Sequence, residues 1–214
     1  LFHFQKIFLF LIFFASFLLP VANTNAQNNN LLDSAKSIFR AQPEKATLIL
    51  KQVNEAATKA KDYKSLVESD IIAGNIAYFK GNHDDALHIY MQALKIAENF
   101  KLHQQISSVC NEIGTLFKKN KDFKNALMYF QRALQEAIIA KSDTDKANSY
   151  NNIGLIYEEE GDYNKALKQY QQSLIAYQKT NNKLGESYSL EYIGYVYGLM
   201  KNYTPAIENL LKSL

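Results

Sequence analysis

Apolar residues recur at helical spacing along most of the chain, and residues 151–174 show the pattern most clearly. Ile153 and Tyr157 fall on one face of a first helix, because residues four apart lie side by side on a helix surface. Gly161-Asp162 is typical of a tight turn. A second helix shows the same spacing at Ala166, Tyr170 and Leu174. The segment therefore predicts two amphipathic helices joined by a turn.

This pattern returns at an interval of forty residues, which indicates an internal repeat. A small residue of the first helix recurs at Gly74, Gly114, Gly154 and Gly194, and one of the second helix recurs at Ala46, Ala86, Ala126, Ala166 and Ala206. A large residue follows the alanine at Leu50, Tyr90, Phe130, Tyr170 and Leu210. The turns read Gly81-Asn82, Lys121-Asp122, Gly161-Asp162 and Lys201-Asn202. Five alanines at one interval are hard to attribute to chance, so we expect a stack of closely packed helix pairs.

The arrangement resembles the tetratricopeptide repeat, whose signature places a small residue and an aromatic residue in each helix of a pair. The resemblance covers nearly everything after Leu31. It implies an all-α fold, a right-handed α-solenoid of antiparallel helix pairs. The family's usual repeat has about 34 residues. The chain therefore resembles a forty-residue variant in which both helices are longer.

The repeat divides the chain into five units. Residues 27–66 form a degenerate first unit, because Ser34 and Ser37 stand where the small and aromatic residues belong, and we expect it to cap the array. The other units are residues 67–106, 107–146, 147–186 and a shorter last one, 187–214.

Residues 1–26 differ in kind from the repeats. Lys6 precedes an uncharged apolar run, residues 7–19, and Thr24-Asn25-Ala26 supplies the small residues of a cleavage site. The run is shorter than the roughly 20 residues that cross a bilayer. We therefore predict a signal peptide cleaved before Gln27 and a periplasmic or secreted protein, with an uncleaved anchor as the alternative.

The composition does not favour an enzyme or a nucleic-acid partner. A net charge of +3, from 24 basic and 21 acidic residues, is too balanced for nucleic-acid binding. Cys110, the single cysteine, excludes an internal disulfide and is expected to be buried and inert. His83, His88 and His103 show no spacing or acidic neighbours typical of a metal site. We predict no catalytic residues, no metal and no cofactor.

Charged residues near the ends of neighbouring first helices predict a ladder of opposite charges between repeats. Glu158, Glu159 and Glu160 occupy positions equivalent to those around Lys118 and Lys119. Each exposed ion pair would contribute less than ~1 kcal/mol.

In this family the inner face of each first helix lines a concave groove. By position, that face carries Glu68, Ile71, Ile72, Asn75, Ser108, Asn111, Glu112, Thr115, Asn148, Asn151, Asn152, Tyr188, Glu191 and Tyr192. Asparagine both donates and accepts hydrogen bonds, so asparagines along a groove can clamp the backbone of an extended peptide. The predicted peptide-binding residues are Asn75, Asn111, Asn148, Asn151, Asn152, Tyr188 and Tyr192. The alternative is that they are polar residues on an exposed helix face.

The family's clamp for a C-terminal carboxylate needs Lys or Arg at these inner positions, which are absent here. The leading prediction is therefore an exported scaffold that mediates protein–protein interaction through its groove. The alternative is an N-terminal sensor fragment of a membrane histidine kinase or helix-turn-helix transcriptional regulator, because exported arrays of this kind resemble the sensory regions of Bacteroidetes signal-transduction proteins. Membrane attachment would then come from a downstream segment.

The C-terminal helix is expected to expose an apolar row that no following repeat covers. The row consists of Ile207, Leu210, Leu211 and Leu214. Fully burying one such side chain contributes roughly 1.5–3 kcal/mol, so an uncovered row favours association. We expect either that the natural chain continues past Leu214 or that two copies pair through this end.

Overall fold

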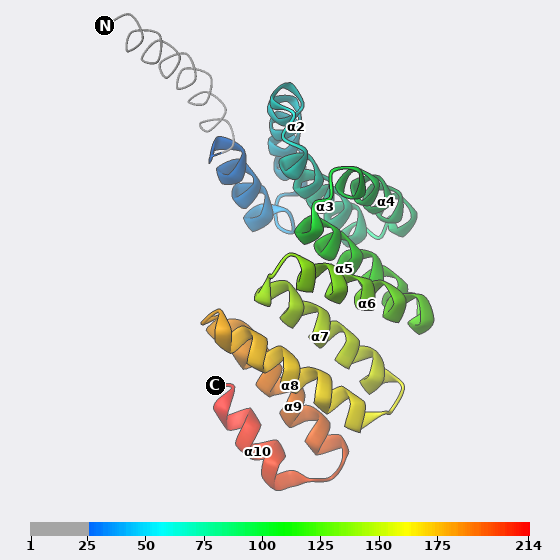
Figure 1. The fold of residues 1–214 in the computed structure, drawn as a ribbon, viewed down its shortest axis with the longest axis vertical. Helices are drawn as coiled ribbons and strands as arrows, with labels where there is room; N and C mark the ends of the chain where they lie inside the picture. The colour runs from blue at the N-terminus through cyan, green and yellow to red at the C-terminus, as the bar shows by residue number, and fades with distance from the viewer. Residues whose placement is uncertain (1–25) are drawn as a thin grey trace, which may run out of the picture. The chain divides into compact units, whose positions relative to one another are not determined.

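The computed structural model describes residues 26–214, so the predicted signal peptide lies outside the described residues except for Ala26. Helical residues 26–38 come first in the described part. The labelled helices of Figure 1 are α2 (Pro43–Ala60), α3 (Tyr63–Phe79), α4 (His83–Asn99), α5 (His103–Lys119), α6 (Phe123–Ile139), α7 (Asp143–Glu159), α8 (Tyr163–Lys179), α9 (Lys183–Leu199) and α10 (Tyr203–Lys212). Residues 26–214 contain no strand. None of their helices is both long enough and apolar enough to traverse a bilayer.

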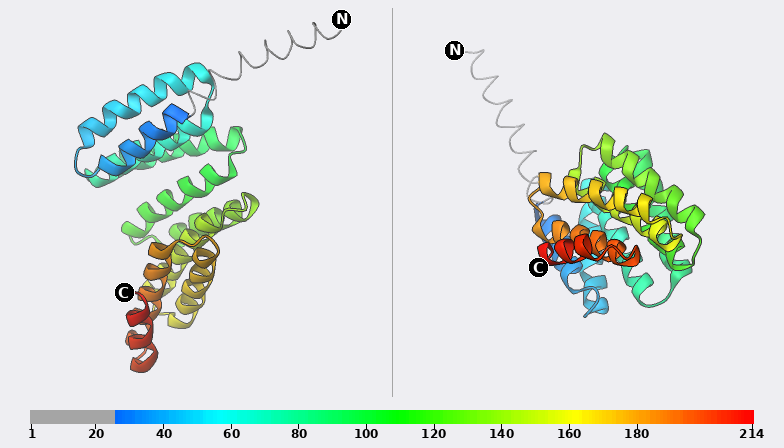
Figure 2. Two further views of the ribbon diagram at one scale, coloured as in Figure 1. Left: turned by 90° about the vertical axis from the view of Figure 1, so that its left-hand side faces the viewer. Right: turned by 90° about the horizontal axis from the view of Figure 1, so that it is seen from below.

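The described residues form two compact units, residues 26–96 and residues 97–214. In the first unit, α2 packs on α3. In the second unit, α5 packs on α6, α7 on α8 and α9 on α10, and each pair contacts the next through α6 with α7 and α8 with α9 (Figure 2). The first helices also touch, α5 with α7 and α7 with α9. The predicted fold class, a right-handed α-solenoid of antiparallel helix pairs, is confirmed.

The small residues lie where two helices approach most closely, as the sequence predicts. A Cβ atom added to Gly114 would lie 2.5 Å from the ring of Phe130, and one added to Gly154 would lie 2.6 Å from the ring of Tyr170. Ala126 and Phe130 are completely buried. Each glycine of a first helix therefore makes room for the large residue of the second helix.

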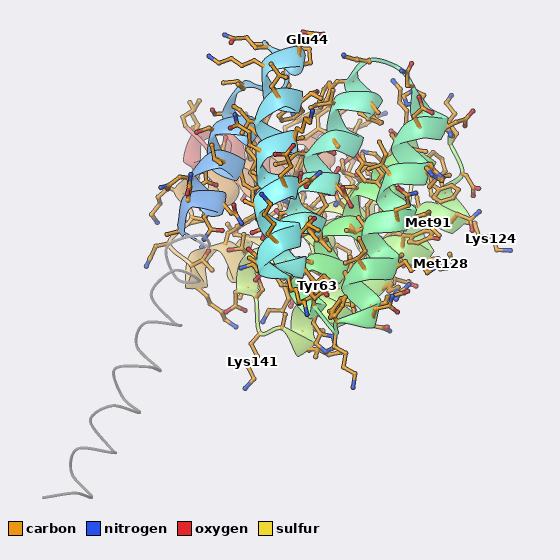
Figure 3. The ribbon with its side chains drawn as sticks, turned by 90° about the horizontal axis from the view of Figure 1, so that it is seen from above. Glu44, Tyr63, Met91, Lys124, Met128 and Lys141 are labelled. Carbon is orange, nitrogen blue, oxygen red and sulfur yellow. The ribbon has the colours of Figure 1, made fainter. Side chains whose placement is uncertain are left out.

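The turns depend on residues in the left-handed backbone region. Gly161 has φ +77°, and the N–H of Asp162 donates to the carbonyl oxygen of Tyr157 at 2.8 Å, the long bond that closes a helix C-terminus. The Asp162 carboxylate then accepts from the N–H of Lys165 at 3.2 Å and caps the next helix. The turns between repeats have non-glycine residues in this conformation, such as Lys141, whose side chain projects from the loop between α6 and α7 (Figure 3).

Helix starts differ from the unit boundaries placed at residues 67, 107, 147 and 187. The first helices begin earlier, at Tyr63, His103, Asp143 and Lys183. The repeat signature marks only residues that pack between helices, whereas the first turn is set by capping residues. The Asp62 carboxylate, for example, accepts from the N–H of Ser65 at 3.1 Å.

The structure tests the predictions made for the side chains of Cys110 and His103. Cys110 is buried and free, and burial raises the pKa of its thiol to about 12, so it is unreactive as predicted. His103, by contrast, does have an acidic neighbour, because its Nδ1 lies 2.6 Å from Oε2 of Glu136 on α6. That neighbour lies too far away in sequence for spacing to reveal it.

The predicted charge ladder is not built from ion pairs at Glu158. Its carboxylate accepts a hydrogen bond from the Tyr170 hydroxyl at 2.7 Å, and burial raises its pKa. Burial lowers the pKa of Lys118, while Glu159 and Glu158 oppose that change. Among residues 26–214, Lys118 makes no ion pair with either carboxylate. Lys118 and these two carboxylates therefore influence each other through the field of their charges rather than through an ion pair.

Candidate functional site

A polar groove of about 320 Å³ lies in the second unit, between the first helices α5, α7 and α9. Its lining consists of Ser108, Asn111, Glu112, Thr115, Asp145, Asn148, Asn151, Asn152, Leu155, Tyr177, Tyr188 and Tyr192. Six of the seven predicted peptide-binding residues belong to this lining, the exception being Asn75. The structure brings these six together because equivalent positions of successive repeats project from the same side of the first helices.

The equivalent face of the first unit is arranged differently. Asn75 lies on α3, and its Oδ1 accepts a hydrogen bond from the Tyr90 hydroxyl of α4. Ile72 was expected on the inner face, but it is 2% exposed and belongs to an apolar core cluster with Leu50 and Val53. That part of the prediction is wrong, because an apolar side chain at this helix position can turn into the core. Glu191 was also expected on the inner face, but it lines a different pocket together with Leu210.

Asn111 and Asn151 hold neighbouring repeats together. The amide Nδ2 of Asn111 donates to the Ser149 hydroxyl at 3.1 Å, and its Oδ1 accepts from Nδ2 of Asn152 at 3.1 Å. Asn151 is only 8% exposed, and its Oδ1 accepts from the Ser189 hydroxyl at 3.5 Å. These bonds join α5 to α7 and α7 to α9. The amides best placed to meet a ligand are therefore those of Asn148 and Asn152.

Asp145 is a lining residue that the sequence reasoning missed. It lies in the first turn of α7, where its N–H donates to the Ser142 hydroxyl at 3.3 Å. A carboxylate is favoured at this place by the helix dipole. Its Oδ2 is nevertheless buried without a hydrogen-bond partner. The spacing of Ser142 and Asp145 resembles a capping box, which was the signal available in the sequence.

Tyrosines form the aromatic part of the groove. The rings of Tyr192 and Tyr170 stack with centroids 5.0 Å apart and an interplanar angle of 21°. Tyr177 donates its hydroxyl hydrogen to Oδ1 of Asn148, and Tyr188 is 49% exposed. Burial, followed by nearby negative groups, raises the pKa of both Tyr177 and Tyr192. The phenols therefore stay protonated near neutral pH and act as hydrogen-bond donors.

This arrangement is suited to binding. Amides, hydroxyls and aromatic faces line the groove together. Amides and hydroxyls can hydrogen-bond to the backbone of a peptide, and aromatic faces can pack against its side chains. Within residues 26–214, no group of three or more His, Cys, Asp or Glu side chains is placed to hold a metal ion.

A larger cavity of about 760 Å³ lies in the first unit, between α2 and α3. Its floor includes Leu50 and Ile76, and its rim includes Lys51, Lys59 and Lys80. None of the predicted peptide-binding residues lines it. The polar groove in the second unit is therefore the better candidate for the predicted site.

Family models for the tetratricopeptide repeat match the chain in both units. One model covers residues 145–214, and another covers residues 71–100 and 107–137. The matches follow the helix pairs of the structure and identify the repeat type. No curated protein sequence matches the chain.

Several solved structures share the fold. BtubC (BKLC) from P. vanneervenii is 17% identical, with 90% of this chain and 89% of that chain covered and a TM-score of 0.64. The pilF protein of Pseudomonas aeruginosa is 13% identical, with 90% and 78% covered and a TM-score of 0.66. The apo form of RapI is 18% identical, with 86% and 51% covered and a TM-score of 0.67. At these identities the likeness shows the fold alone.

Proposed function

Since this chain belongs to the tetratricopeptide-repeat proteins, we propose that it is a non-enzymatic scaffold whose groove between α5, α7 and α9 holds an extended peptide of a protein partner. Proteins built from this repeat bind protein partners. The groove is the place for this interaction because amide side chains and tyrosines converge there.

The observation that carries the proposal is the pair Asn148 and Asn152 beside the tyrosine wall. An extended backbone offers alternating N–H and C=O groups, and a primary amide can pair with either. Asn148 is exposed, and Asn152 is half-buried with its Nδ2 on Asn111. Tyr188, about half exposed, offers an aromatic face for the peptide's side chains.

The double variant Asn148→Ala, Asn152→Ala should therefore bind peptide much more weakly. Each lost hydrogen bond contributes about 0.5–1.5 kcal/mol, so the pair predicts an affinity roughly 5-fold to 100-fold lower. A peptide selected from a random display library with the wild-type protein serves as ligand, and fluorescence anisotropy gives the dissociation constant. Replacing Asn111 or Asn151 would be a poorer test, because Asn111 uses both its amide nitrogen and its amide oxygen in bonds to α7 and Asn151 is buried.

A matched control is Gln172→Ala, which removes an exposed amide from α8 outside the groove lining. The control should bind as the wild type does, and circular dichroism should show equal helicity for all three proteins. If the double variant binds the peptide as tightly as the wild type does, the peptide-binding site lies on another surface.

Export is a second part of the proposal, and it rests on residues 1–26 alone. We propose a periplasmic or secreted protein of the forty-residue repeat type, similar to the sensory regions of Bacteroidetes signalling proteins. The alternative, a sensor fragment of a membrane histidine kinase or helix-turn-helix regulator, gains no support from the matched family models, which describe repeats only. We propose no nucleic-acid partner, because the overall charge is nearly balanced.

We also propose that two copies associate through α10. Ile207 is 58% exposed and Leu211 is 65% exposed, and both border a hollow together with Leu210. Light scattering should then report a dimer for the wild type and a monomer for Leu211→Lys, because a charge in an apolar interface loses its hydration. Leu48→Lys is the control, since Leu48 is 66% exposed on α2 and should leave the dimer intact. A monomeric wild type would contradict this proposal.

A further inference from the structure

We propose that the groove selects peptides that present a basic side chain, arginine in particular, to Asp145 and Glu112. This inference rests on the proposed peptide binding and narrows it from a backbone clamp to a site with a charge preference. It concerns the second unit only, to which all the lining residues belong.

The first support is the charge of the lining. Glu112 and Asp145 are its only ionisable acids apart from the tyrosines, and no Lys, Arg or His belongs to it. The chain as a whole carries a net charge of +3, so the charge of this groove is opposite in sign to the net charge of the protein. Charges of one sign in a cleft with low-dielectric walls focus their field and attract a ligand of the other sign.

The second support is the unsatisfied carboxylate of Asp145. Its Oδ2 is buried and has no hydrogen-bond partner, a costly arrangement for a charged group. The helix dipole favours a negative charge at the start of α7, but it does not supply a donor to this oxygen. Asp143, in the same turn, forms an ion pair with Lys146. One acid of the turn is therefore neutralised within the protein, while the other lines the groove without a partner for its buried oxygen.

The third support is the aromatic wall. A cation is attracted to the face of a tyrosine ring, and a guanidinium group can stack on the ring while its N–H groups bind a carboxylate. Tyr188 and Tyr192 line the groove from α9, and the two carboxylates line it from α5 and α7. Asn152 offers an amide oxygen that can accept a further N–H. This set of groups fits arginine better than lysine, whose ammonium group is compact and strongly hydrated.

The competing explanation is that water molecules satisfy Asp145 and that the acids are merely a hydrated surface. In that case the sign of a ligand's charge would make little difference. The two explanations therefore differ in what happens when the charge of a peptide is removed without changing its shape.

Titrating the full ¹⁵N-labelled chain with acetyl-Gly-Gly-Arg-Gly-Gly-amide tests the proposal by amide chemical shifts. The comparison peptide carries citrulline, which has the shape of arginine without its charge. We expect shifts around Asp145, Asn152 and Tyr192, and an affinity for the arginine peptide at least about tenfold higher than for the citrulline peptide. Raising the salt concentration should weaken only the arginine peptide.

Asp145→Asn should remove the difference between the two peptides, because it keeps the shape of the side chain and removes its charge. Asp143→Asn is the matched control, since Asp143 lies in the same turn but is paired with Lys146 and is absent from the groove lining. It should keep the preference for arginine.

The outcomes separate this inference from the proposed function. Equal binding of the two peptides, with shifts in the groove, would overturn the charge preference and leave peptide binding standing. If neither these peptides nor those selected from a library shift any groove residue, both proposals fail. A preference that survives Asp145→Asn unchanged would overturn the role of Asp145.

Discussion

Phe130→Ala should lower the free energy of unfolding by about 3–5 kcal/mol, the largest loss that we expect from a single substitution. Phe130 is completely buried and packs in a core cluster with Ala126, Ile153 and Ile156. Removing its ring leaves a cavity between two helices and against the following repeat. Urea denaturation followed by circular dichroism measures the change.

The same site permits a test of the helix register. Gly114→Ala alone should also destabilise the protein, because its Cβ would lie 2.5 Å from the Phe130 ring. Once the ring has been removed, the added methyl group has room, and alanine is favoured over glycine in a helix by about 1 kcal/mol. The two changes should therefore be strongly non-additive. Met128→Ala is the control. Met128 lies on α6, as Phe130 does, but it is 53% exposed, so this substitution should hardly change the free energy of unfolding (Figure 3).

Ala166→Leu should destabilise the protein by about 1–3 kcal/mol through overpacking. Ala166 is completely buried and belongs to a core cluster with Tyr170, Ile193 and Val196. Lys168→Ala, at an exposed position two residues away, should hardly change the melting temperature. Equal losses from the two substitutions would contradict the packing described here.

The sequence was sufficient to predict the features that repeat locally. Gly154 and Ala166 mark the closest approach of their two helices, as their spacing indicated, because small residues recur only where backbones come close. The turn at Gly161 was predictable for a similar reason, since glycine readily adopts a positive φ. The sequence did not reveal the turn at Lys141, because lysine has no preference for the positive φ that it adopts there.

The site was predictable in location but not in its internal bonds. Positions on one helix face placed nine lining residues correctly, whereas the partners of their side chains depend on the neighbouring repeat. Asn111 bonds to Ser149, which is 38 residues away, and no local pattern announces this pairing. Asp145 was missed because the local sequence does not distinguish a first-turn acid that lines a groove from one that only caps a helix. Its role as a lining residue follows only from the packing of α5, α7 and α9.

The most direct test of the central claim is to map where a bound peptide lies. A library-selected peptide carrying a photoreactive diazirine can be crosslinked to the full chain, and mass spectrometry then identifies the labelled residues. The account predicts labels in the groove, on residues such as Asn148, Asn152 and Tyr188. Labels confined to the exposed side of α6, at residues such as Met128 and Ile139, would contradict it.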